Sequence, residues 1–204
     1  MISAKQTQVT TIELLRHGQC EGGEIFRGST DVLLTDHGWQ QMLDSVKGNT
    51  YDRVVSSPMQ RCKHFSSALA EQSELPLTVQ PGLEEIHFGD WEGHSRDAIE
   101  REHGDIVQQF WRDPLTISPP NGEATLDFQR RVTRAFSAVT EKALGERVLI
   151  VTHGAVIRVI MCHLLDIPLS SMSNISVPYA GRTTFAIYHH EDNEPWVQLI
   201  AHQG

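Results

Sequence analysis

The chain has 204 residues, a hydrophobic share of 39% and a formal net charge of −9. Its length predicts one domain over residues 1–204, with a flexible N-terminal tail over residues 1–10. The acidic balance excludes a basic nucleic-acid surface, no apolar run is long enough to cross a bilayer, and the first ten residues lack the apolar core of a secretory signal. We therefore expect a cytoplasmic protein without nucleic-acid or membrane partners.

Short apolar runs predict strands at 11–15, 53–56, 77–79 and 148–152. Two further runs, 183–188 and 196–201, predict a final strand pair joined by the polar turn around 190–193. Between the first four runs lie helical patterns. Strands that alternate with helices predict an α/β fold, a three-layer sandwich with a mostly parallel central sheet flanked by helices.

Capping and turn residues give the helix bounds. Thr35 can cap a helix to about residue 47, and Pro58 can occupy the first turn of a helix to about residue 71. Ser95 can cap a helix to about residue 103, followed by helical turns at 106–111 and a proline-rich loop at 114–122. A long helix is predicted over 125–143, ended by Gly145, and another over 155–165.

Cysteine and histidine spacing argue against a metal site. The three cysteines, Cys20, Cys62 and Cys162, are an odd number without ligand spacing and suit a reducing compartment. Cys62 and Cys162 are expected to be small packing residues on helices. The chain has no His-x-His or His-Glu-x-x-His pattern. We expect no metal and no cofactor, and turnover that chelation leaves undiminished.

Two predicted strands end at a histidine followed by glycine. Arg16, His17 and Gly18 follow the first run, and His153 with Gly154 follows the run at 148–152. Because open α/β sheets bind ligands at the carboxyl ends of their strands, these residues predict two walls of one anion pocket. In an acidic protein such a pocket needs a local cluster of cations.

Five residues have the side chains that phosphoryl transfer needs: a nucleophile, cations and a proton donor. Each of them alone has a simpler structural explanation. A neutral imidazole is a competent nucleophile when its other nitrogen is held by a hydrogen bond. Guanidinium forks bind phosphoryl oxygens bidentately, and a partly buried carboxylic acid can protonate a leaving alkoxide. The five are Arg16, His17, Arg61, Glu85 and His153.

Six segments, in order, resemble the motifs of the histidine phosphatase superfamily, which is related to cofactor-dependent phosphoglycerate mutase. The segments are Leu15–Gly18, Arg27–Gly38, Ser56–Arg61, Leu83–Gly93, Asn121–Glu123 and Val151–Arg158, and the similarity around them extends roughly from Thr11 to Ala201. The resemblance implies a phosphoglycerate mutase-like fold and a phosphate monoester as substrate. Within the family, the stretch Phe88–Gly93 and the chain length are most like those of alpha-ribazole phosphatases, so alpha-ribazole 5′-phosphate is the expected substrate.

The resemblance also implies a role for each site residue. His17 would be the phosphorylated nucleophile, and Glu85, three positions before Phe88, would be the proton donor in place of its neighbour Glu84. The other implied residues would contact substrate: Arg16, Arg61 and His153 at the phosphoryl oxygens, Arg27 at the substrate, and backbone donors near Gly18 and Gly154.

Two positions depart from the family pattern. Cys20 stands where relatives usually have Thr or Ser, and Gly23 where many have Asn. Cys20 is expected near the substrate, where a thiol is a weak hydrogen-bond partner, so we expect altered affinity or selectivity with activity retained. Cys20 is not a cysteine-phosphatase nucleophile, because residue 26, where that class needs Arg, is Phe26.

The chain is short between Trp91 and Asn121. A more open pocket favours water as the second acceptor, hence a phosphatase, with a broad-specificity phosphatase or a mutase-like phosphotransferase as alternatives. A non-catalytic binding module on the same fold is the alternative from another class. Trp91 and Trp111 are expected to pack in the core, with stacking of an aromatic residue such as Trp111 on a bulky leaving group as the alternative. The sequence leaves the oligomeric state open, a homodimer included.

Overall fold

A computed structural model describes residues 8–190 and 193–203 and contains one six-stranded sheet. The strand order is β3-β2-β4-β1-β5-β6; β3, β2, β4 and β1 are parallel, whereas β5 and β6 are antiparallel additions at one edge. The strands are β1 Gln8–Arg16, β2 Arg53–Ser56, β3 Leu77–Val79, β4 Arg147–Thr152, β5 Arg182–His190 and β6 Asn193–His202.

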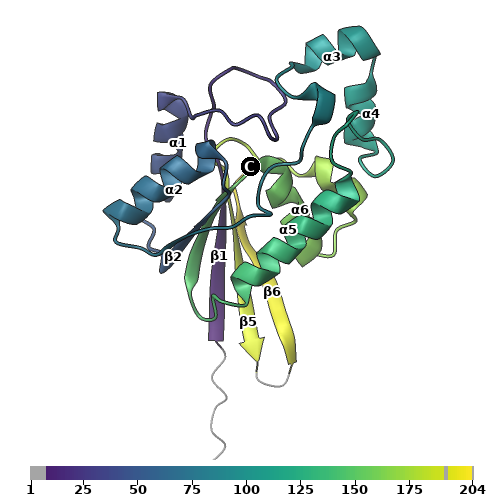
Figure 1. Cartoon of the computed structure of the whole chain (residues 1–204). Coiled ribbons are helices and arrows are strands. Elements are labelled where there is room, and N and C mark those ends of the chain that lie inside the picture. Colours follow the sequence, from purple (N-terminus) through teal and green to yellow (C-terminus); the bar gives the residue numbers. More distant parts are fainter. Residues whose placement is uncertain (1–7, 191–192, 204) are drawn as a thin grey trace, which may run out of the picture.

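Helices cover both faces of this sheet, as Figure 1 shows. One face packs against α1 Asp36–Val46 and α2 Gln60–Gln72, and the other against α5 Thr125–Thr140 and α6 Gly154–Leu164. The shorter helices α3 Arg96–His103 and α4 Ile106–Arg112 join the second side, with 3-10 turns at η1 Gly89–Trp91 and η2 Leu169–Asn174. The predicted three-layer α/β sandwich is confirmed.

Alternation along the strands divides the core in two. In β4, Val148 and Ile150 belong to the cluster under α5 and α6, whereas Leu149 and Val151 belong to the cluster under α1 and α2. Successive side chains of a strand point to opposite faces. A strand buried on both faces is therefore a continuous apolar run, the pattern from which β4 was predicted.

The predicted caps of two helices are confirmed. Thr35 Oγ1 accepts a hydrogen bond of 2.9 Å from the Gly38 N–H at the start of α1. Ser95 Oγ accepts one of 3.2 Å from the Ala98 N–H at the start of α3. Each satisfies a donor that has no partner inside its helix.

Three boundary predictions are wrong. Residues 8–10 belong to β1 and not to a tail, because β5 extends far enough to pair Gln8 with His189 and Val9 with Tyr188. Residues 1–7 lie outside the described part.

The other two wrong boundaries concern helices. Pro58 precedes α2, since Met59 is extended at ψ 138° and the helix starts at Gln60. The helix α5 ends at Thr140, five residues before Gly145. The predicted turn near 190–193 lies partly outside the described residues.

The parallel strands bring the predicted site residues to one edge of the sheet. The carboxyl ends of β1 and β4 lie side by side, with Arg16 opposite Thr152 in the register, and β2 pairs with the other edge of β4. The segments that follow these three strands, which are far apart in sequence, therefore meet above the sheet (Figure 1).

Candidate active site

His17 directly follows β1 and is 3% exposed. Its backbone N–H donates to the Thr152 carbonyl at 2.9 Å, which fixes it against the end of β4. Its Nδ1 lies 2.8 Å from the Gly18 carbonyl oxygen. Because a carbonyl only accepts, Nδ1 carries the hydrogen in the neutral ring and Nε2 keeps its lone pair.

The turn after His17 depends on two glycines in contact. A Cβ on Gly18 would lie 2.0 Å from the Gly38 carbonyl oxygen, and a Cβ on Gly38 would lie 2.0 Å from the Gln19 carbonyl oxygen. Neither distance is compatible with a side chain. The backbone that orients His17 therefore lies directly on the first turn of α1.

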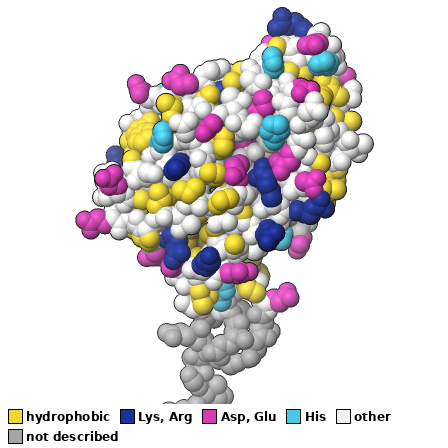
Figure 2. Space-filling view, viewed as in Figure 1, with side chains coloured by type: hydrophobic (Ala, Val, Ile, Leu, Met, Phe, Trp, Pro, Cys, Tyr) yellow, Lys and Arg dark blue, Asp and Glu magenta, His cyan; other side chains and the backbone are white. Residues whose placement is uncertain are grey.

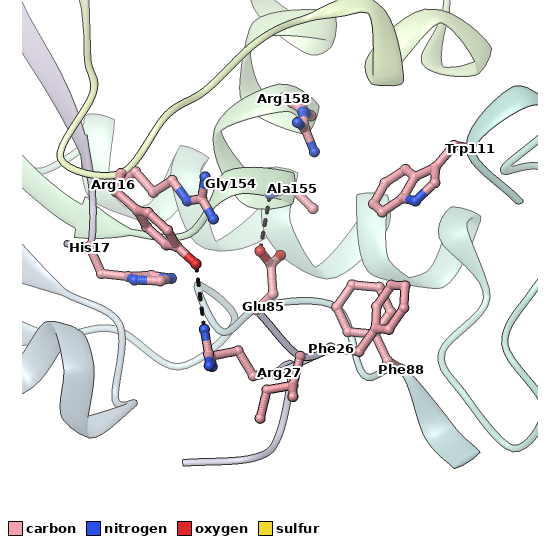
Figure 3. Close-up of a pocket in the computed structure, with 12 residues that line it drawn as sticks. Arg16, His17, Phe26, Arg27, Glu85, Phe88, Trp111, Gly154, Ala155 and Arg158 are labelled. Carbon is pink, nitrogen blue, oxygen red and sulfur yellow. Dashed lines mark hydrogen bonds between the residues drawn. The ribbon is translucent and has the colours of Figure 1, made fainter. Parts of the chain in front are cut away.

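His17 lines a cavity of about 280 Å³ that also contains three arginines and a carboxylate. Figure 3 shows Arg16, Arg27 and Arg158 around it, with Glu85 between them. On the face seen in Figure 2, basic and acidic side chains are interspersed. Although the protein is acidic overall, the charges that line this cavity are mostly positive.

Arg16, the last residue of β1, extends its guanidinium along the cavity. Its Nη1 donates to the Val177 carbonyl at 2.6 Å, and its guanidinium carbon lies 4.2 Å from the Tyr179 ring centre. Its Nε is buried without a partner among the described residues. A Cβ on Gly154 would lie 3.4 Å from that Nε, an ordinary contact distance, so the guanidinium lies directly against the start of α6. Burial lowers the pKa of Arg16.

Arg27 lines the opposite wall. Its Nη2 donates to the carbonyls of Glu21, at 2.9 Å, and Gly23, at 2.5 Å. Its Nη1 lies 3.5 Å from the Tyr179 hydroxyl. Gly23, one of the departures from the family pattern, thus supports Arg27 through its backbone.

Arg61 and His153 lie behind His17 and do not line the cavity. Arg61 is fully buried; its Nε donates to His153 Nδ1 at 3.2 Å, and its Nη atoms donate to the carbonyls of Thr30, Arg27 and Gly28. His153 Nε2 lies 2.7 Å from Ser57 Oγ. The rings of His17 and His153 are 5.3 Å apart. The contact of Arg61 and His153 with phosphoryl oxygens stays a prediction, because their hydrogen bonds here go to protein atoms.

Burial and the nearby arginines keep both histidines neutral. Desolvation lowers the pKa of His17 well below 6.5, and the charges of Arg61 and Arg16 lower it further. Desolvation and Arg61 likewise lower the pKa of His153 well below 6.5. Uncharged imidazole is the form that can act as a nucleophile.

Glu85 reaches the cavity from the loop that follows β3. Its Oε1 accepts from the Ile86 N–H at 3.0 Å, and its Oε2 accepts from the Ala155 N–H at the start of α6 at 3.1 Å (Figure 3). Its neighbour Glu84 does not line the cavity and accepts from the Gly82 N–H at 2.6 Å. Of the two adjacent carboxylates, Glu85 therefore lines the cavity and Glu84 does not, which agrees with the choice that the family resemblance implies.

Cys20 and Gly18 lie next to His17 but do not line the cavity. The Cys20 sulfur is 3.3 Å from His17 Nδ1 and 3.5 Å from the Gly18 carbonyl oxygen. Burial raises the pKa of this thiol, so it is neutral. Cys20 therefore contacts the Nδ1 side of the imidazole, and Gly18 contributes its carbonyl to the same nitrogen. A contact between the Gly18 N–H and substrate stays a prediction. Cys62 and Cys162 are buried, as expected.

Sequence reasoning missed several lining residues. Tyr179 comes from an irregular segment with no pattern to mark it, although its ring covers Arg16. Arg158 lies one turn after Ala155 on α6, and helical spacing from Gly154 could have indicated it. Trp111, expected in the core or against a leaving group, is half-buried, packs against the core and lines the cavity with Phe26 and Phe88, whereas Trp91 is in the core.

Glu92 organises the loop that carries Arg27. Its carboxylate accepts hydrogen bonds of 2.9–3.1 Å from the backbone N–H groups of Gly28, Ser29, Thr30 and Phe88, and one from the Thr30 hydroxyl. Burial raises the pKa of this carboxyl, but the hydrogen bonds outweigh it and the net shift is downward. Because the carbonyls of that loop accept from Arg61, Glu92 holds the acceptors of Arg61 in place.

The sequence model of the histidine phosphatase superfamily, branch 1, matches residues 12–201. The chain belongs to this superfamily. It is 30% identical over 169 residues to the adenosylcobalamin/alpha-ribazole phosphatase of Salmonella typhimurium, which covers 80% of this chain and 84% of the relative. It is 31% identical over 166 residues to a 2,3-bisphosphoglycerate-dependent phosphoglycerate mutase of Bartonella henselae, covering 76% and 81%.

Solved structures of the superfamily share the fold. The alpha-ribazole phosphatase of Shigella flexneri matches 95% of this chain and 96% of its own with a TM-score of 0.80 at 24% identity. A mycobacterial glucosyl-3-phosphoglycerate phosphatase matches 95% and 98% with a TM-score of 0.83 at 23% identity. The fold of the chain is therefore phosphoglycerate mutase-like, and the family match identifies the chain as an enzyme of the histidine phosphatase superfamily.

Membrane-spanning helices and clusters of metal-binding side chains are both absent from residues 8–190 and 193–203. Within them, no helix has the length and apolar character to cross a membrane. No group of three or more His, Cys, Asp or Glu side chains in the same residues is arranged to hold a metal ion.

The Glu92 contacts predict a pH-dependent contribution to stability. Glu92→Gln keeps the size but removes the charge, and we expect it to lower the free energy of unfolding by about 2 kcal/mol at pH 7, as for charged hydrogen bonds. Because the folded pKa lies below the ordinary 4.5, the advantage of the native chain is complete above pH 4.5 and shrinks as pH falls below it. Urea unfolding of both chains between pH 7 and 4 measures this; a difference independent of pH would contradict it.

Proposed function

We propose that this protein hydrolyses phosphate monoesters through a phosphohistidine formed on His17. The observation that carries the proposal is a neutral imidazole with Nδ1 bonded to the Gly18 carbonyl, in a cavity that also contains three arginines and Glu85. That arrangement supplies a nucleophile, cations for the transferring group and a proton donor in one place.

The reaction runs in two steps. His17 Nε2 attacks phosphorus, the bond from phosphorus to the ester oxygen breaks, and the protonated Glu85 gives its proton to that oxygen, so that the alcohol leaves. Water then attacks the phosphohistidine, Glu85 takes a proton from it, and the phosphorus–nitrogen bond breaks with its electron pair returning to Nε2. Inorganic phosphate leaves and Glu85 is again protonated.

Charge in the transition state is spread over the phosphoryl oxygens and needs fixed cations. Arg16 and Arg27 line the cavity and are the first donors we assign to this task. Arg61 and His153 are also proposed to contact these oxygens, as the family resemblance implies, together with backbone donors near Gly154.

For the substrate we propose alpha-ribazole 5′-phosphate, which would place the enzyme in assembly of the cobalamin nucleotide loop. Aromatic side chains support a planar leaving group: Phe26, Phe88 and Trp111 form one wall of the cavity, and aromatic rings stack on such groups. Relatives with that activity in their names match at 30% identity over most of their length. The mutase relatives keep a phosphotransferase as the second candidate.

We propose that the enzyme works in the cytoplasm as one domain over residues 1–204. Its cysteines, Cys20, Cys62 and Cys162, are unpaired and buried, which suits a reducing compartment.

His17→Ala should abolish the covalent intermediate. Protein incubated with a labelled phosphate ester and quenched with alkaline detergent is expected to carry base-stable, acid-labile label in the native chain and none in the variant. Hydrolysis should fall at least about 10³-fold, as for loss of a nucleophile. A variant that turns over at the native rate would show that His17 is not the nucleophile, and a native chain inactive on every ester would favour a binding module.

Glu85→Gln should slow esters with poor leaving groups most. An alkoxide needs a proton as it departs, whereas dinitrophenolate does not, so kcat/KM for an alkyl phosphate should fall about 10²-fold or more, and that for dinitrophenyl phosphate only slightly. Both esters are measured on the same preparation. Equal losses would contradict proton donation by Glu85.

A substrate panel tests the identity of the ester. We expect kcat/KM for alpha-ribazole 5′-phosphate to exceed that for 3-phosphoglycerate and sugar phosphates by at least about tenfold, an advantage of roughly 1.4 kcal/mol in transition-state binding. A flat profile would favour a broad-specificity phosphatase. Interconversion of phosphoglycerates faster than phosphate release would favour the phosphotransferase.

A further inference from the structure

One side chain of α5 fixes the loop that carries Glu85 from outside the cavity. Arg131 donates to the carbonyl oxygens of Gly82 at 3.1 Å, Glu84 at 2.8 Å and Glu85 at 2.9 Å. The carbonyl of Leu83 accepts from Thr152 Oγ1 at 2.9 Å, at the end of β4. All four successive carbonyls of this loop are therefore held, three of them by one guanidinium.

Glu123 fixes the orientation of that guanidinium. Its two carboxylate oxygens each lie 2.7 Å from a nitrogen of Arg131, one from Nε and one from Nη2. The backbone of Glu123 also donates to the His87 carbonyl at 2.8 Å. With three bonds to the loop and two to Glu123, Arg131 uses all five of its N–H donors.

The loop lies close enough to α5 for these bonds because of Gly82. Its φ of +94° is in the region that favours glycine, and a Cβ there would lie 2.8 Å from the Ala135 Cβ. Gly82 thus permits the close approach of the loop to α5. Arg131 on the same helix then donates to the carbonyls that this approach brings near.

Arg131 does not line the cavity, so it cannot act on substrate directly. We propose that Arg131, oriented by Glu123, is a positioning residue that holds Glu85 at the distance and angle needed to protonate the leaving oxygen. The inference rests on the proposed function of Glu85. Proton transfer needs a donor within hydrogen-bond reach, and a displacement near 1 Å in such a group is costly.

Lysine cannot replace this arginine. A lysine ammonium is a point charge with three donors on a flexible stem, whereas the planar fork reaches several carbonyls and a carboxylate at once. Arg131→Lys therefore keeps the positive charge but loses the geometry. Arg131→Met removes both, and Glu123→Gln removes the charge that orients the fork.

The test compares leaving groups. For Arg131→Met we expect kcat/KM to fall about 10²-fold for an alkyl phosphate and less than about threefold for dinitrophenyl phosphate, the pattern of Glu85→Gln. Arg131→Lys and Glu123→Gln should also lower kcat/KM more for the alkyl phosphate than for dinitrophenyl phosphate, but with a smaller loss than Arg131→Met. The quantity kcat/KM is used because it reports the steps up to departure of the alcohol.

Arg130→Met is the matched control. Arg130 precedes Arg131 on α5, has an exposed side chain and pairs with Asp127, so both esters should react at the native rate. Amide hydrogen exchange over residues 82–87 should be faster in Arg131→Met than in the native chain and unchanged in Arg130→Met.

Three results would overturn the inference: equal losses for the two esters, which indicate a general structural role, no loss for either, or unchanged exchange over residues 82–87. If Arg131→Met does not fold, Arg131→Lys and Glu123→Gln decide by the same comparison. Failure of the proposed function is distinguishable, because the native chain would then form no phosphohistidine and Glu85→Gln would not discriminate between the esters.

Discussion

The parallel pairing of β1 with β4 is the constraint on which the site depends. It places Arg16 opposite Thr152 and lets the His17 N–H bond to the Thr152 carbonyl, so that two histidines distant in sequence meet with rings 5.3 Å apart. A slip of one residue would turn every side chain of β1 to the other face of the sheet.

The arginines of the site are held mainly by neutral acceptors. Arg16, Arg27 and Arg61 donate to backbone carbonyls in the loops around the cavity. A carbonyl satisfies a guanidinium donor without cancelling its charge, so the positive potential stays available to an anion. Arg131, by contrast, is paired with the Glu123 carboxylate and serves the loop of Glu85. Arginines bound to carbonyls keep a positive charge that a substrate anion can meet, whereas Arg131, bound to a carboxylate, serves to fix the backbone.

Much of the fold and part of the site could be predicted from the sequence. Strands such as β2 and β3 were predicted to the residue, because they are apolar runs bounded by turn residues. The start of β1 could not be, since it is set by pairing with a strand some 170 residues away. Motif spacing identified His17 and Glu85 correctly as neighbours of one cavity. It could not reveal that Arg61 is engaged with three loop carbonyls, or that Tyr179 covers Arg16, because both depend on irregular segments folded against each other.

The contact between Gly18 and Gly38 restricts the amino acids that this chain can accept. An alanine at either position would place its methyl group 2.0 Å from a carbonyl oxygen of the other segment. Even alanine would therefore force α1 away from the turn after His17. Gly48, two residues beyond the other end of α1, has nothing within 4 Å of its Cβ position, and only its φ of +77° favours glycine there. A saturation library should therefore be depleted of every substitution at 18 and 38, which would mark a backbone crossing, and not a ligand contact, as an invariant element of the enzyme.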